Sequence, residues 1–232
     1  LSQSSLSAIL SFMLFVVILV FSNKETSMDL VDIFPATIAV TELQSLTPDL
    51  IEKAIAEVAH GELIKDLESD GAYTREQNLL DKVMFRDVKE EILKNCMELA
   101  QAYSHRVAQM EICNSWGNIT GLGQSIRFHR HVNSYLSGSF YLTEGSAFTF
   151  HNFLGENLFS MMPETNEDPN NFRGQKSFVI NPKPGRLILF PSGLHHSVQH
   201  SQNTEMRYSI AFNTIPIGKI GSPTNLVEFL PS

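Results

Sequence analysis

The spacing of apolar residues predicts two helices in the first half of the chain. Apolar positions recur at helical intervals between Leu50 and Val58, directly after Thr47 and Pro48. Thr47 is a favoured N-cap residue, and Pro48 is a favoured first helical residue. A second apolar stripe predicts a helix over about residues 85–106. Both stripes indicate helices that pack one face against a core.

From Glu111 onward the pattern predicts strands. Short segments rich in β-branched and aromatic residues follow one another, separated by Gly, Asn, Pro and Ser. This order favours a mainly β protein with N-terminal helices (α+β) and a double-stranded β-helix core, the jelly-roll or cupin-like barrel. An earlier strand is predicted over 33–41, an exposed polar loop over 68–77, and a long polar loop at the mouth of a site over 155–174. The predicted core strands lie near residues 112–119, 125–131, 135–143, 146–151, 176–181, 186–190, 195–200 and 206–214.

We divide the chain into four segments. Residues 1–27 are an apolar leader, 28–110 hold a strand and buttressing helices, 111–215 form the double-stranded β-helix core, and 216–232 are a C-terminal tail. The leader contains a 14-residue apolar run, whereas a spanning helix needs about 20 residues. No basic residue precedes that run and no signal-cleavage pattern follows it. We interpret the leader as upstream translation or a fragment artefact; a membrane anchor at residues 8–21 and a degenerate signal peptide are the alternatives.

Charge and cysteine content narrow the class of protein. The net charge of −8 argues against nucleic-acid binding, which needs a basic face. Cys96 and Cys113 form no zinc pattern and are interpreted as two reduced, buried thiols of a cytosolic protein. We expect no stable membrane association unless the leader is an anchor, and the oligomeric state stays open.

Two histidine motifs provide candidate metal ligands. His129 and His131 are separated by one residue, so on a strand both imidazoles would project from one face and Arg130 from the other. Two neighbouring neutral imidazoles are suitable metal ligands, although two ordinary strand histidines would give the same pattern. Further along, His195 and His196 follow a turn, and only one of them can face inward.

Arg207 is the candidate anion anchor. It shares a strand face with Ser209 in the segment RYSIAFN. An inward-facing arginine is costly to bury without an anion, and its planar fork suits a carboxylate. The alternative is a surface ion pair with Glu205.

Taken together, these motifs resemble the 2-oxoglutarate/Fe(II)-dependent oxygenase superfamily. The resemblance is strongest to a poorly characterised branch, common in marine bacteria and phages, that reads W-x-N, H-x-H, S-x-x-S-G-x-x-Y and P-G-x-L-x-L-F-P-S-x-x-x-H in this order. The matching segments here are Trp116–Asn118, His129–His131, Ser134–Tyr141 and Pro184–His196, followed by the R-x-S of Arg207.

The resemblance implies a hydroxylase that uses Fe(II), 2-oxoglutarate and O2 on an unknown prime substrate. It implies that His129, His131 and His196 bind the iron. It also implies that Arg207 and Ser209 hold the far carboxylate of 2-oxoglutarate with help from Tyr141. Asn118 would bind the near carboxylate or line the substrate pocket, and Trp116 is expected in the core.

One departure from the superfamily pattern leaves alternatives open. The better-known members have Asp or Glu where this chain has His131. If His131 binds directly, three neutral ligands leave the iron one positive charge higher; otherwise His131 stands beside the metal without binding it. Two rival functions are a cupin-like three-histidine dioxygenase without 2-oxoglutarate and a non-catalytic barrel that binds a metal or an anion.

Overall fold

The computed structural model describes residues 36–65, 71–152, 175–202 and 204–230. The described residues from 37 onward belong to one compact unit. The predictions for the leader (1–27), the start of the 33–41 strand and the 155–174 loop lie outside the described residues. Within the described part, no helix combines the length and the apolar character needed to cross a membrane.

Two α-helices, two 3-10 turns and twelve strands make up the described chain. In order they are β1 (Ala39–Glu42), α2 (Pro48–His60), β2 (Leu63–Lys65), β3 (Ala72–Thr74), η1 (Leu79–Asp81), η2 (Val83–Phe85), α3 (Arg86–Ala102), β4 (Gln109–Thr120), β5 (Ile126–His129), β6 (Leu136–Tyr141), β7 (Phe148–His151), β8 (Ser177–Ile180), β9 (Arg186–Pro191), β10 (His196–Val198), β11 (Arg207–Ile220) and β12 (Val227–Phe229).

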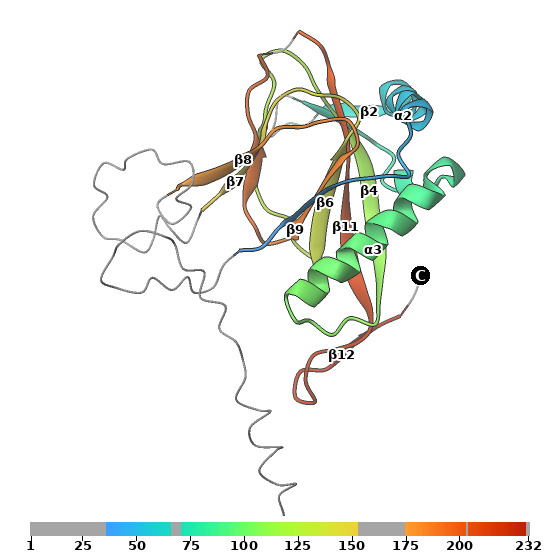
Figure 1. The fold of residues 1–232 in the computed structure, drawn as a ribbon, viewed down its shortest axis with the longest axis vertical. Coiled ribbons are helices and arrows are strands. Elements are labelled where there is room, and N and C mark those ends of the chain that lie inside the picture. The colour runs from blue at the N-terminus through green and yellow to red at the C-terminus, as the bar shows by residue number, and fades with distance from the viewer. Residues whose placement is uncertain (1–35, 66–70, 153–174, 203, 231–232) are drawn as a thin grey trace, which may run out of the picture. The chain divides into compact units, whose positions relative to one another are not determined.

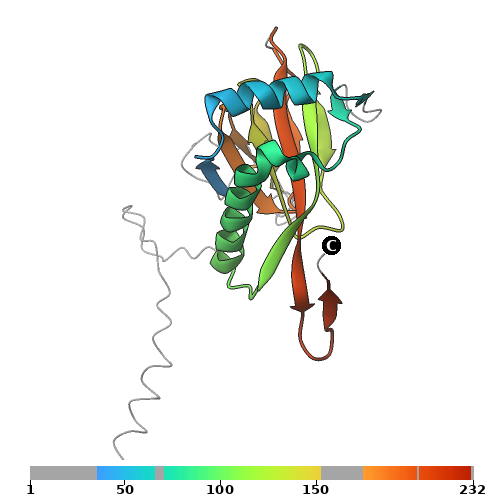
Figure 2. The ribbon, with the colours of Figure 1, turned by 90° about the vertical axis from the view of Figure 1, so that its right-hand side faces the viewer.

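Both helices begin and pack as their sequences predict. The Thr47 side chain accepts a hydrogen bond from the Leu50 backbone N–H and so caps α2, with Pro48 as its first residue. In α3, Val88 and Ile92 are fully buried on the stripe that faces the sheet. Burying such a side chain is worth about 1.5–3 kcal/mol. Figure 2 shows α2 and α3 covering one face of the larger sheet.

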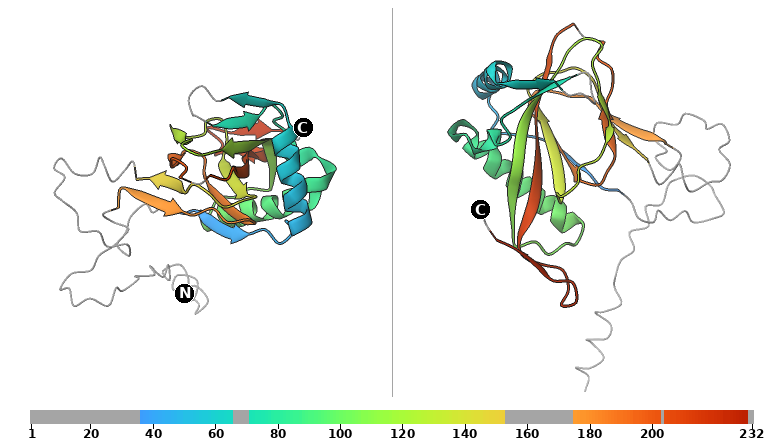
Figure 3. Two further views of the ribbon diagram at one scale, coloured as in Figure 1. Left: turned by 90° about the horizontal axis from the view of Figure 1, so that it is seen from above. Right: turned by 180° about the vertical axis from the view of Figure 1, so that it is seen from behind.

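Two antiparallel sheets enclose the interior. The larger sheet has the order β1-β9-β6-β11-β4-β3-β2, with β12 paired to β11, and the smaller has the order β5-β10-β7-β8. One apolar cluster, which includes Phe190 of the larger sheet and Phe148 of the smaller, fills part of the space between them. Figures 1 and 3 show the two sheets on opposite sides of this space. This is the predicted double-stranded β-helix arrangement.

The two faces of strand β11 lie in different surroundings, one against the helices and one against the pocket. Ile210 and Phe212 point toward the helices and are fully buried in the main core. Arg207 and Ser209, two residues apart, point to the other face, as the alternation of side chains requires. The helices therefore support one face of the sheet, while its opposite face is left for polar groups.

Several element predictions need correction. The segment 68–77 is not only an exposed loop, because its described part forms β3, which pairs with β4 at Tyr73 and Asn118. The strand predicted over 125–131 ends at His129, so His131 lies in the loop beyond β5. Strand β11 continues to Ile220 and turns into β12, so the segment 216–232 contains regular structure.

Candidate metal and co-substrate site

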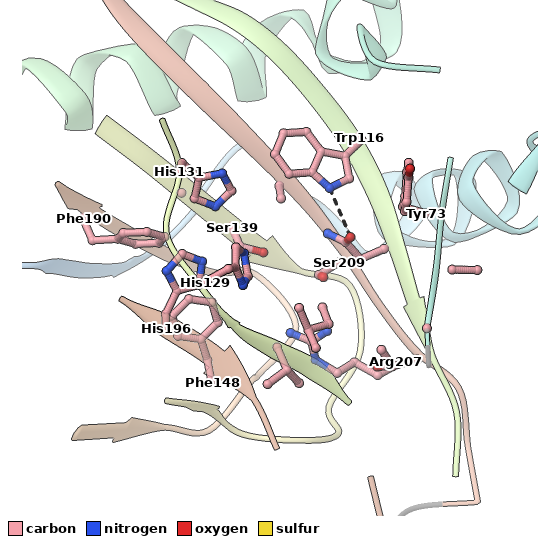
Figure 4. A pocket seen from close by; sticks show the side chains of 18 of the residues that line it. Tyr73, Trp116, His129, His131, Ser139, Phe148, Phe190, His196, Arg207 and Ser209 are labelled. Carbon is pink, nitrogen blue, oxygen red and sulfur yellow. Dashed lines mark hydrogen bonds between the residues drawn. The ribbon is translucent and has the colours of Figure 1, made fainter. Parts of the chain in front are cut away.

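A pocket of about 290 Å³ opens between the two sheets. Its wall combines polar side chains from β4, β5, β10 and β11 with the aromatic rings of Phe148 and Phe190. Figure 4 shows the three histidines gathered at one end and Arg207 at the other. The pocket therefore has a metal-ligating end and a cationic end.

The structure brings His129, His131 and His196 together. Their rings lie 4.2 to 5.2 Å apart between centroids, and one potential ligand atom from each lies within 4.8 Å of the others. Direct pairing of His196 on β10 with His129 on β5 produces this proximity. The neighbouring His195 faces the other way and stacks on Phe128, so His196 is the inward member of its pair.

Backbone carbonyls set the tautomers of two of these imidazoles. His129 Nδ1 lies 2.7 Å from the Arg127 carbonyl oxygen, and His196 Nδ1 lies 2.9 Å from that of Leu194. A carbonyl oxygen only accepts hydrogen bonds, so each Nδ1 must carry the proton. Each Nε2 is then left with its lone pair, as a metal ligand requires. His131 is held through its backbone N–H, which donates to the Ser192 carbonyl.

Burial keeps the two inner histidines neutral. Desolvation, reinforced by the nearby His129, lowers the pKa of His131 to about 4. The same causes lower the pKa of His196 to about 2. Phe148 stacks on the His196 ring at 5.0 Å, and Phe190 meets it edge-on at 4.8 Å. Two aromatic rings therefore shield this imidazole from water.

These lowered pKa values predict acid sensitivity of the metal-free protein. Between the ordinary histidine pKa of 6.5 and the folded value of about 4, His131 binds a proton in the unfolded chain but not in the folded one. The free energy of unfolding should therefore fall as the pH drops through this window, and His196 should extend the loss below it. Urea unfolding with a chelator, from pH 7 to 4, measures the slope. The His131→Gln variant should show a shallower slope, and equal slopes would contradict the shift.

At the other end of the pocket, Arg207 is buried without an ion-pair partner. Its side chain is 1% exposed, and its Nε and Nη1 have no hydrogen-bond partner among the described residues. Burial lowers the pKa of the guanidinium, which the nearby Tyr141 opposes. The alternative of a surface pair with Glu205 is wrong, because Glu205 is exposed while Arg207 is buried. A buried, unpaired fork suits an incoming carboxylate.

Tyr141 lies against this arginine. The guanidinium carbon is 5.0 Å from the centre of the tyrosine ring. The phenol is fully buried, and its oxygen has no partner at hydrogen-bond geometry among the described residues, although it lies close enough to the Arg207 guanidinium for each group to influence the pKa of the other. Burial raises the pKa of Tyr141 to about 12, so the phenol remains a neutral donor. Tyr141 and Arg207 together offer donors to one acceptor group.

Strand register aligns a polar row across the larger sheet. Ser209 on β11 is paired with Tyr141 on one side and with Asn118 on the other, and Asn118 is paired with Tyr73. Directly paired residues share a face, so the row is directed to the pocket. The predicted residues Ser209, Tyr141 and Asn118 are thus neighbours of Arg207.

Trp116 fixes the orientation of the Asn118 amide. The Trp116 indole N–H donates to Asn118 Oδ1 at 3.1 Å (Figure 4). Because an indole nitrogen only donates, the oxygen of the amide must face it. The Asn118 Nδ2 donors are left for the pocket. Trp116 is therefore not the core residue that the sequence suggested; it is half-buried, lines the pocket and lies 5.9 Å from the His131 ring.

Other pocket residues were missed by sequence reasoning. Thr120 is paired with Arg207, and its buried hydroxyl has no partner among the described residues. Tyr73 comes from a short strand in a polar segment with no recognisable signal. Gly138 was recognised only as part of the S-x-x-S-G-x-x-Y motif. The structure shows why glycine is needed there, because an added Cβ would lie 2.4 Å from Phe212 Cζ.

Comparison with known proteins assigns the class. Residues 114–213 match a family model described as "Putative 2OG-Fe(II) oxygenase". No curated protein matches the chain in sequence. The match covers 100 of the 232 residues, and over this barrel core the chain is similar to 2-oxoglutarate- and Fe(II)-dependent oxygenases. Enzymes of that family use Fe(II), 2-oxoglutarate and O2.

Solved structures share the fold at low sequence identity. A Pseudomonas putida prolyl-4-hydroxylase aligns with a TM-score of 0.55 and 15% identity, over 79% of this chain and 94% of its own. The α-ketoglutarate-dependent epimerase SnoN of nogalamycin biosynthesis aligns with a TM-score of 0.57 and 12% identity, over 79% and 77%. HygX from Streptomyces hygroscopicus, solved with nickel and 2-oxoglutarate, aligns with a TM-score of 0.53 and 13% identity, over 78% and 83%. These likenesses support the double-stranded β-helix fold.

The donor set of the pocket fits these cofactors. Imidazole nitrogens are common ligands of iron in proteins. Arg207 and Thr120 line the pocket with unpartnered nitrogens and an unpartnered hydroxyl, and Tyr141, also unpartnered, lies against the guanidinium; a carboxylate would offer acceptors to such donors.

Proposed function

We propose that His129, His131 and His196 bind Fe(II) and that Arg207 anchors 2-oxoglutarate in a C–H hydroxylase. The observation that carries this proposal is the meeting, in one pocket, of three clustered imidazoles with a buried, unpaired guanidinium. When bound, the iron supplies the redox and Lewis-acid chemistry that couples oxidation of 2-oxoglutarate to oxidation of the substrate. The residues of the chain bind and orient 2-oxoglutarate and exclude water from the pocket.

Each proposed contact has a defined role. Arg207 would hold the far carboxylate of 2-oxoglutarate with its guanidinium donors, and Ser209 and the neutral phenol of Tyr141 would add further donors. Asn118 offers its oriented Nδ2 donors to the nearer carboxylate. Phe148 and Phe190 exclude water from the metal end. These assignments are supported by position and donor chemistry.

The substrate of an oxygenase of this class is a small molecule or a protein side chain. The wall of the pocket also contains Tyr73, Gln77 and Trp116. Among the described lining residues, Arg207 is the one Lys, Arg, Asp or Glu side chain. We infer that the oxidised part of the substrate is uncharged, because a charge there would lose water without gaining a partner.

We also propose a cytoplasmic location and a division of labour along the chain. Cys96 and Cys113 are free thiols, which is usual in a reducing compartment; Cys96 is buried as predicted, but Cys113 is exposed, so that part of the prediction is wrong. Residues 28–110 act as a buttress and residues 111–215 as the catalytic core, since α2 and α3 support the face of the sheet opposite the pocket.

Anaerobic spectroscopy tests the proposed function. Adding 2-oxoglutarate to Fe(II)-loaded protein should produce a weak visible charge-transfer band, because the keto acid would bind the metal through two oxygens. Adding succinate, which lacks the keto group, should produce none. Absence of the band at saturating 2-oxoglutarate would contradict the proposal.

A three-histidine dioxygenase that works without 2-oxoglutarate is the second candidate. The presence of His131 where the common pattern has a carboxylate favours it. The buried, unpaired Arg207 opposes it, since such an enzyme needs no carboxylate anchor. Metal binding without any effect of 2-oxoglutarate would select this alternative.

A further inference from the structure

The turn between β6 and β7 passes directly over the stem of Arg207. Gly145 in this turn has a φ of +145°, a backbone conformation that residues with a side chain rarely adopt. A Cβ added to Gly145 would lie 2.8 Å from Arg207 Cβ, 3.1 Å from Cγ and 3.2 Å from Cδ. The first of these distances is too short for any real contact, so one of the two residues would have to move.

Hydrogen bonds hold this turn in place beside β11. The Leu142 N–H donates to the Tyr208 carbonyl at 3.0 Å, and the Tyr208 N–H donates to Thr143 Oγ1 at 2.9 Å. Both bonds attach the turn to the residue next to Arg207. The nearest atom, Arg207 Cβ, is fixed by the backbone of β11, and these bonds tie the start of the turn to the same strand. An added methyl group would therefore press the turn and β11 apart and shift the whole arginine side chain.

We propose that Gly145 is a positioning residue for Arg207. It contributes no atom to 2-oxoglutarate; by leaving room for the stem it allows the guanidinium to lie in the pocket wall, against Tyr141. A long arginine side chain loses considerable rotamer freedom when it binds, and packing of the stem removes that loss beforehand. The inference rests on the proposed role of Arg207.

Calorimetric titration of 2-oxoglutarate into Mn(II)-loaded protein tests it. Gly145→Ala should bind 2-oxoglutarate about tenfold more weakly, the size expected when a side chain is forced off its rotamer. Its metal stoichiometry should equal that of the parent. Gly123→Ala is a control for a positive φ without a steric clash, because Gly123 has a φ of +75°, close to the left-handed helical region, and an added Cβ would meet nothing within 4 Å. That variant should retain the affinity of the parent.

A double-mutant cycle in urea gives a readout independent of ligand. Arg207→Gly removes Cβ, Cγ and Cδ and with them all three close contacts, so Gly145→Ala should cost less stability in that background. Should the single Gly145→Ala variant fail to fold, recovery of folding in the double variant would still support the inference. If Gly145→Ala lowered the free energy of unfolding equally in both backgrounds, or prevented folding in both, the inference would be overturned.

The two proposals fail in different ways. If the parent binds 2-oxoglutarate, Arg207→Ala loses it and Gly145→Ala matches the parent, the positioning role is wrong and the proposed function stands. If the parent itself binds no 2-oxoglutarate, the proposed function fails, whatever Gly145 does.

Discussion

Replacing His196 or His129 with alanine is expected to abolish stoichiometric metal binding while the protein stays folded. His196 is 3% exposed and lies at the centre of the cluster, with His129 directly paired to it. Removing a direct ligand should weaken metal binding by more than the roughly 10–100-fold typical of groups that only support a ligand. Elemental analysis and competition titration on folded variants measure the effect.

The same measurement decides the role of His131. If His131 binds the metal directly, His131→Ala should match the other two variants; if it stands beside the metal, the loss should remain within the supporting range. His200→Ala is the control, because His200 lies just beyond β10 but is exposed. Full metal content in both His129→Ala and His196→Ala would rule out this site.

Arg207→Ala is expected to retain metal and lose 2-oxoglutarate. A guanidinium has donors only, so it cannot bind a cation. Cutting away one partner of a buried, charge-assisted pair costs on the order of 2–5 kcal/mol. Since about 1.4 kcal/mol is a factor of ten, affinity should fall roughly 30-fold or more. Arg207→Lys should recover only part of the lost affinity for 2-oxoglutarate, because an ammonium group cannot reproduce the planar fork of the guanidinium.

Anaerobic calorimetry with Mn(II) as an inert substitute gives these affinities. Arg130→Ala is a suitable control, since Arg130 lies between two proposed ligands in sequence but is exposed. If Arg130→Ala weakened binding as much as Arg207→Ala, the attraction would come from overall charge. Unchanged affinity in Arg207→Ala would place the anchor elsewhere.

The sequence predicted the class of fold and which residues would meet, but not always for the right reason. His129 and His131 were expected to share a strand face, yet the strand ends at His129. The rings still meet because the His131 N–H donates to the Ser192 carbonyl, a contact between segments far apart in sequence. Alternation along β11 did place Arg207 and Ser209 correctly, since that strand is long and paired on both sides.

Features that depend on packing could not be predicted. Strand β3 is three residues long, and its pairing with β4 brings Tyr73 to the pocket. The sequence suggested that Trp116 is a core residue. Its hydrogen bond to Asn118 depends on both side chains lying on the same face of one strand. The contact between Gly145 and Arg207 joins residues 62 positions apart, and the chain gives no local sign of it.

The unequal anchoring of the two ends of the site has a consequence for hydrogen exchange. Strand β5, which carries His129, has four residues and lies at the edge of the smaller sheet, paired to β10 at an irregular register. Strand β11, which carries Arg207, has fourteen residues and lies between β4 and β6. Edge strands open locally at low free energy, whereas central strands exchange their amide protons close to global unfolding. Amide protons of β5 should therefore exchange early in the metal-free protein and slow down on metal loading, while those of β11 stay protected in both states.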